Sequence, residues 1–200
     1  MIRQILKELK HHYPFTLFGA FTGIIIMLIL HNITIPPKAS HAIFYTLHPL
    51  HVLLSALVTA SMYELHTRGK CNLWILIIIG YIGSIGIATL SDSIIPYIGE
   101  TLLNLPNKGI HLGFIEKWWL VNPLALIGIL IAYFRPTTKF PHSGHVLLST
   151  WASLFHIIMA LGSSTSWSSY IVIFFFLFIS VWIPCCISDI VFPLLFVKET

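Results

Sequence analysis

The sequence predicts an all-α, polytopic integral membrane protein with six transmembrane helices, built as two inverted copies of a three-helix repeat. Two observations support this prediction. The chain of 200 residues is 56% hydrophobic and only 9% charged, whereas a soluble domain carries about 25% charged residues. In addition, three short motifs occur twice in the same order, which indicates an internal duplication.

The duplicated motifs are a histidine pair, an acidic motif and a proline–glycine motif. The pattern His-x-x-His-Val-Leu-Leu-Ser occurs at 48–55 and again at 142–149. Ser-Asp-x-x-x-Pro follows at 91–96 and 188–193. A weaker match, Pro-x-x-Leu-x-Gly, precedes both at 14–19 and 123–128. Histidine and aspartate are costly inside a membrane, so the repeated positions are where function is expected.

Six apolar segments approach the roughly 20 residues that a membrane-spanning helix needs. They lie at about 14–34, 42–63, 72–98, 120–134, 142–162 and 169–197. We predict one membrane domain over 1–200, in which repeat one covers 14–98 and repeat two covers 120–197. The connection at 99–119 is expected at the membrane interface. Three spans per repeat force the second copy to cross in the opposite sense, as in inverted-repeat transporters.

The distribution of Lys and Arg predicts the orientation. The two termini and the turns at 64–71 and 135–141 share one side of a six-span protein. This side carries eight basic residues, namely Arg3, Lys7, Lys10, Arg68, Lys70, Arg135, Lys139 and Lys198. The other side carries three, namely Lys38, Lys108 and Lys117. The positive-inside rule therefore predicts that both termini are cytoplasmic.

Each repeat carries a polar stripe on its second helix. Residues three or four positions apart lie on one helix face, and such a stripe must face protein, water or an ion because lipid cannot satisfy it. Asp92 and Asp189 fall near the far ends of the next helices, at the level of the histidines of their own repeat. We expect a polar pathway lined by Ser55, Thr59, Ser91, Ser149, Ser153, His156 and Ser188.

Two imidazoles and one carboxylate per repeat are a plausible ligand set for Zn²⁺ or another first-row divalent metal ion. The predicted ligands are His48, His51 and Asp92 toward the outside, and His142, His145 and Asp189 toward the cytoplasm. Histidine also titrates near neutral pH, so the same groups suit a proton relay. The structural alternative is that these side chains only hydrogen-bond the helices together.

Two further features lie outside the repeated design. His111 and Glu116, in the outer connection, are candidates for the outer mouth of the pathway. Cys185 and the adjacent Cys186 invite comparison with soft-metal sites, but the first repeat has Ala88 and Thr89 at these positions. The cysteines are therefore expected to be small packing residues.

The favoured hypothesis is a small transporter or channel-like permease for a divalent metal cation, with proton coupling as an option. An integral-membrane metalloenzyme acting on a lipid-borne substrate is one alternative, although no sequence motif of nucleophilic or zinc-protease catalysis is present. A haem-binding, quinone-binding or scaffolding subunit of a membrane complex is the other. The expected partners are the lipid bilayer and a second copy in a homodimer. A nucleic-acid partner is not expected, because basic residues are few.

Overall fold

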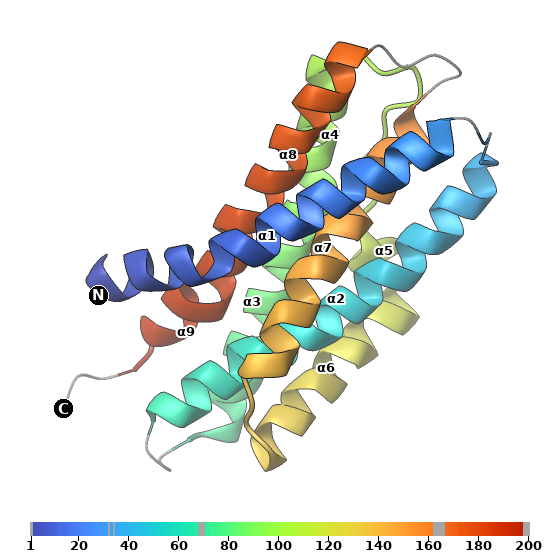
Figure 1. Ribbon diagram of the computed structural model, residues 1–200. Helices are drawn as coiled ribbons and strands as arrows, with labels where there is room; N and C mark the ends of the chain where they lie inside the picture. Colours follow the sequence, from blue (N-terminus) through green and yellow to red (C-terminus); the bar gives the residue numbers. More distant parts are fainter. Residues whose placement is uncertain (1, 32, 34, 68–70, 162–166, 198–200) are drawn as a thin grey trace.

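The computed structural model describes residues 2–31, 33, 35–67, 71–161 and 167–197, and Figure 1 shows them as a bundle of long helices. The described part contains helices and connections without a strand, which confirms the all-α prediction. The elements in chain order are α1 (Ile2–His31), α2 (Pro37–His66), α3 (Leu73–Thr89), η1 (Leu90–Ile94), α4 (Ile95–Leu102), α5 (Gly113–Glu116), α6 (Trp118–Phe134), α7 (Lys139–Ala160), α8 (Trp167–Cys186), η2 (Ile187–Val191) and α9 (Phe192–Leu194).

Five helical segments are long and apolar enough to cross a membrane. They are Tyr13–Leu30, Pro37–His66, Leu73–Leu102, Pro141–Ala160 and Ser169–Leu194. Helix α6 is also apolar but has 17 residues, or about 26 Å of helix against a hydrocarbon core of about 30 Å. The five long segments make the chain a multi-pass membrane protein.

The segment boundaries differ from the predicted ones in several places, and the second helix, for example, begins at Pro37 instead of 42. The first helix begins at Ile2, well before the predicted start at 14. The third segment continues to Leu102, so that Glu100 belongs to a helix and not to the interfacial connection. The predicted ends at 34 and 162 lie outside the described residues, as do Arg68, Lys70 and Lys198 of the charge count.

Both aspartates of the repeated motif lie in a π-helical turn. In η1, the backbone N–H of Ile95 donates to the carbonyl of Leu90, five residues earlier. The proline four residues after each aspartate has no N–H to donate to the aspartate carbonyl, which explains why the α-helix is interrupted here. Such one-turn π segments are frequent at functional sites.

The first helix of each repeat packs against the other repeat. Helix α1 lies against α7 and α8, and α6 lies against α2 and α3. The glycines of the Pro-x-x-Leu-x-Gly motif make these contacts: Gly19 meets the side chain of Thr150, and Gly128 meets the carbonyl oxygen of Leu53. Small residues allow such close backbone approach between membrane helices. The helices thus form two packed units, α1/α7/α8 and α2/α3/α6, which pack closely against each other through α2 and α7.

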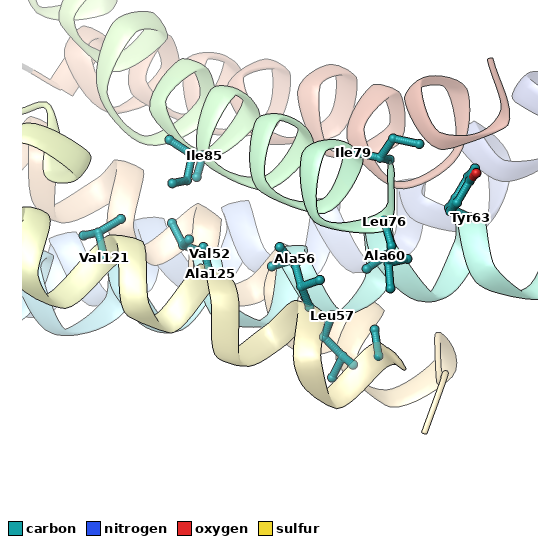
Figure 2. Close-up of a cluster of buried hydrophobic side chains, with 13 residues drawn as sticks. Val52, Ala56, Leu57, Ala60, Tyr63, Leu76, Ile79, Ile85, Val121 and Ala125 are labelled. Carbon is teal, nitrogen blue, oxygen red and sulfur yellow. The ribbon is translucent and has the colours of Figure 1, made fainter. Parts of the chain in front are cut away.

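Each packed unit has its own apolar core. Figure 2 shows the larger core, in which side chains of α2, α3 and α6 interlock, including Val52, Leu76, Val121 and Ala125. The second core joins α1 to α7 and α8 through residues such as Ala20, Leu154 and Leu177. The polar residues of the repeated motifs lie between the two cores, on α2, α7 and the two π turns.

Candidate functional site

Asp92 is fully buried and accepts hydrogen bonds at both carboxylate oxygens. Its Oδ2 lies 2.9 Å from Nδ1 of His48 and 2.7 Å from Nδ1 of His51. Its Oδ1 accepts from the hydroxyls of Ser91, at 2.7 Å, and Ser149, at 2.8 Å. Four donors on one carboxylate offset the cost of burying it in a membrane. The structure thus brings together the first predicted histidine–aspartate group.

This arrangement fixes which imidazole nitrogens face a ligand. When Nδ1–H of a neutral histidine donates to a carboxylate, the lone pair is left on Nε2. Nε2 of His51 is buried and has no hydrogen-bond partner among the described residues. Nε2 of His48 lies against Gly113 of α5, so close that a Cβ on this glycine would overlap the imidazole ring. His51 is therefore the histidine of this group that can present a nitrogen to a ligand.

The second predicted group, His142, His145 and Asp189, also comes together. Both histidines of the first group face the aspartate with Nδ1, whereas His145 faces Asp189 with Nε2. Oδ2 of Asp189 lies 2.9 Å from Nδ1 of His142 and 2.8 Å from Nε2 of His145. His145 and Asp189 are fully buried, whereas His142 is 17% exposed. One donor atom from each of these three residues lies within 4.8 Å of the others, so the group could hold a metal ion.

The two groups are in contact with each other. The sequence predicts them at opposite membrane depths, but the ring centroids of His51 and His145 lie 5.5 Å apart, and those of His142 and His145 lie 5.3 Å apart. The reason is that α2 and α7 pack against each other along their polar stripes. The result is one continuous polar cluster inside the bundle rather than two separated sites.

Most of the predicted pathway hydroxyls bridge the two repeats. Ser149 donates to Asp92, Ser153 donates to the carbonyl of Ser91 at 2.9 Å, and Thr59 lies 3.1 Å from the hydroxyl of Ser188. All of these side chains are buried. Thr59 and Ser153 are equivalent positions of the two repeats, and so are Ser91 and Ser188. Ser153 of the second repeat thus contacts Ser91 of the first, and Thr59 of the first repeat contacts Ser188 of the second.

Ser55 is the exception among the pathway residues. It is fully buried on α2, one turn beyond His51, and its hydroxyl has no hydrogen-bond partner among the described residues. A buried hydroxyl without a partner is uncommon. The hydroxyl oxygen of Ser55 could therefore bind a ligand, such as an ion or a water molecule, inside the polar cluster.

The predicted outer-mouth residues, His111 and Glu116, form a third polar group at α5, and Glu116 is the last residue of this helix. Glu116 accepts hydrogen bonds from the hydroxyl of Tyr45 and, at 3.1 Å, from the backbone N–H of Leu112. Nδ1 of His111 lies 3.5 Å from the same carboxylate. Burial raises the pKa of Glu116, but the bonds from Tyr45 and His111 outweigh it and hold the pKa below the ordinary value. This contact between α5 and α2 is therefore present at neutral pH and is lost as the pH falls through that lowered value.

Glu100 is a site residue that the sequence analysis missed. Its carboxylate is fully buried, 2.6 Å from Nδ1 of His156, and it accepts the backbone N–H of Gly109 at 3.2 Å. The ring of His156 also lies 5.2 Å from the ring of His111. The available signal was the continuation of an apolar helical pattern through 95–102, which places Glu100 in a helix that enters the bundle.

Cys185 also belongs to the cluster, although the repeat comparison suggests only packing. The thiol packs with Val146 and Val181 as expected. Its sulfur also lies within 4.8 Å of a ring nitrogen of His51 and of His145. The side chain of Cys186 lies outside the part of the chain that the structure describes.

Replacing Gly113 with Ala is expected to lower the stability of the protein in detergent by about 1–3 kcal/mol, the usual cost of overpacking. The added methyl group would overlap the buried ring of His48 and displace α5 or the histidine. Thermal unfolding of the purified variant measures this effect. Gly109→Ala is the matched control, because its Cβ would make only ordinary contact with His111. Equal losses in both variants would contradict the contact between α5 and His48.

No protein-family model, no curated protein and no solved structure matches this chain. Similarity to known proteins thus assigns it neither a family nor an activity. What its residues offer chemically is a buried cluster of imidazoles, carboxylates, hydroxyls and one thiol inside a membrane bundle.

Proposed function

We propose that the protein is a small transporter or channel-like permease for a divalent first-row metal cation such as Zn²⁺. The observation that carries the proposal is the contact between the two His/His/Asp groups inside the bundle. Ionisable side chains in a membrane segment generally mark an ion pathway or a proton relay. Imidazole nitrogen and carboxylate oxygen are ligands that suit zinc and its first-row neighbours.

The two aspartates take different roles in this proposal. Asp92 already accepts four hydrogen bonds, so it orients the imidazoles and does not bind the ion itself. Carboxylates commonly orient metal-binding histidines in this way. His51 then presents Nε2 to the cation, while His142, His145 and Asp189 supply the second ligand set. His48 positions the cluster beneath α5.

The inverted repeat is part of the proposal, and three features support it. The π turns at 90–94 and 187–191 are separated by the same 97 residues as Asp92 and Asp189. The hydroxyl contacts between the repeats are reciprocal. Finally, α1 and α6 occupy equivalent positions, each packed on the other half. Alternating access would come from movement of α1/α7/α8 against α2/α3/α6, with the polar cluster at their boundary.

The orientation follows the distribution of basic residues, with both termini in the cytoplasm. The end of the bundle covered by α5 then faces outward, with His111 and Glu116 at its mouth. Below them, the buried pair of His156 and Glu100 is placed to exchange protons, because Nε2 of His156 has no partner among the described residues. Proton coupling would use this pair. The exposed apolar side chains of the outer helix faces, such as Trp74, Phe134 and Ile171, would contact lipid.

The proposal is tested by ion flux in liposomes. Wild-type protein should move Zn²⁺ across the membrane, and His51→Ala should reduce the initial rate by about tenfold or more, as expected when a metal ligand is removed. His66→Ala is the control, because His66 is exposed and bonds only the carbonyl of Met62 in its own helix. Equal rates in all three proteins, or no Zn²⁺ flux in any of them, would refute the transport function. A Soret band in the purified protein would instead favour the haem alternative.

A further inference from the structure

We infer that His51, His145 and Cys185 form a metal site between the two repeats, and that the transported cation is therefore a thiophilic one of the Zn²⁺ type. This inference rests on the proposed function and deepens it by naming the class of cargo. A sulfur ligand separates zinc-like ions from Mg²⁺, Ca²⁺ and Mn²⁺, which prefer oxygen ligands. The site differs from the His142/His145/Asp189 group in this sulfur atom.

The geometry supports three ligands from three helices. His51 lies on α2, His145 on α7 and Cys185 on α8, and all three are at most 1% exposed. Their donor atoms lie within 4.8 Å of one another. Around a tetrahedral Zn²⁺ with two nitrogen ligands and one sulfur ligand, the donor atoms would be roughly 3.3–3.7 Å apart. Since no pair of donor atoms is more than 4.8 Å apart, a contraction of at most about 1.5 Å would bring them to these separations.

His51 is already oriented for such a role. Its Nδ1 is held by Asp92 at 2.7 Å, which leaves Nε2 buried and without a hydrogen-bond partner among the described residues. This is the arrangement in which a carboxylate fixes the tautomer of a metal-binding imidazole. A buried nitrogen acceptor that no donor satisfies is costly, and a cation would relieve this cost.

The site lies where the two repeats meet. His51 and His145 are equivalent positions of the duplicated motif, and their rings are in contact. The equivalent of Cys185 in the first repeat is Ala88, which is buried. The sulfur ligand therefore comes from the second repeat only. The two repeats contribute equivalent histidines to the site, but only one of them contributes a thiol.

His145 is shared between this site and the His142/His145/Asp189 group. A cation bound by His51, His145 and Cys185 could exchange His51 and Cys185 for His142 and Asp189 while remaining on His145. Each exchange breaks and forms metal–ligand bonds without releasing the ion to lipid. The shared histidine thus connects the ligand set between the repeats with a ligand set made by the second repeat alone.

Cobalt titration of the purified protein in detergent tests the site, because a Co²⁺–thiolate bond gives a near-ultraviolet charge-transfer band that nitrogen and oxygen ligands do not give. Wild-type protein should show this band. Cys185→Ala should lose the band and bind Co²⁺ about tenfold or more weakly, since loss of even an outer-shell partner costs roughly 10–100-fold. Alanine should be tolerated, because Ala88 stands at the equivalent position. Cys71→Ala is the control, since Cys71 lies before α3, away from the cluster.

The outcomes separate this inference from the transport proposal. Zn²⁺ flux in wild type without a thiolate band refutes the cysteine site and leaves transport standing. A band that persists in Cys185→Ala also refutes the site. A band that depends on Cys185, without flux, supports the site and refutes transport. Zn K-edge X-ray absorption of wild-type protein gives a check that needs no variant: a zinc–sulfur distance near 2.3 Å is expected, and scattering from nitrogen and oxygen alone would overturn the inference.

Discussion

Asp92→Ala is expected to abolish high-affinity metal binding and to destabilise the bundle. The change leaves two imidazole N–H groups and two hydroxyls without their common acceptor, and each buried donor that stays unsatisfied costs roughly 1–3 kcal/mol. Without the carboxylate, nothing fixes the tautomer of His51, so Nε2 is no longer held ready for a cation. Isothermal titration with Zn²⁺ and thermal unfolding measure the two effects.

Two companion variants separate orientation of the histidines from general damage. Asp92→Asn keeps the size of the side chain but weakens its bonds to the imidazoles, so Zn²⁺ affinity should fall more than stability does. Ser149→Ala removes one of the four donors and should cost only about 0.5–1.5 kcal/mol, the net value of one hydrogen bond. If Asp92→Asn bound Zn²⁺ as tightly as wild type, Asp92 would not be a positioning residue.

Gly128→Ala should strongly destabilise the contact between α6 and α2. A Cβ at this position would overlap the carbonyl oxygen of Leu53 and press on Ala56. Backbone atoms cannot rotate away as a flexible side chain can, so the cost should reach the upper end of the roughly 1–3 kcal/mol typical of overpacking. Thermal unfolding in detergent, together with the yield of folded protein, measures this loss.

Gly86→Ala is the matched control for this variant. It adds the same methyl group to a helix glycine that has no neighbouring atom within 4 Å of the new Cβ, and it improves helix propensity. Its stability should equal or slightly exceed that of wild type. If Gly128→Ala were as stable as Gly86→Ala, the close packing of α6 on the other repeat would be contradicted.

The histidine–aspartate neighbours could be predicted from the sequence because two local rules determine them. A spacing of three residues places His48 and His51 on one helix face. The helix that follows runs antiparallel to α2, and this returns Asp92 to the same level. The same two rules apply to His145 and Asp189, and the structure brings both sets together.

The contacts between the repeats could not be predicted in this way. Hydrophobic periodicity shows that a helix is buried, but it does not show which helix covers it. The packing of Gly128 against Leu53, and of Gly19 against Thr150, depends on shape complementarity between segments far apart in the chain. Helix α2 also packs directly on α7, and this contact brings the ring centroids of His51 and His145 to 5.5 Å.

The site roles of Glu100 and Cys185 could not be predicted for a different reason. Neither residue has a counterpart in the other repeat, so the duplicated motifs predict an interfacial position for Glu100 and only a packing role for Cys185. Glu100 lies in α4, which continues past the predicted end of the third segment at 98. Cys185 comes close to the imidazoles only through the packing of α8 on α7.

The joined histidines of the two repeats are expected to bind a metal ion. Elemental analysis of protein purified after exposure to Zn²⁺ and removal of free metal tests this claim most directly. At least one zinc per wild-type chain is expected, and the double variant His51→Ala/His145→Ala should retain less than about a tenth of it, because its remaining ligands are too few to complete a site. Equal zinc content in the double variant and the wild type would contradict the account.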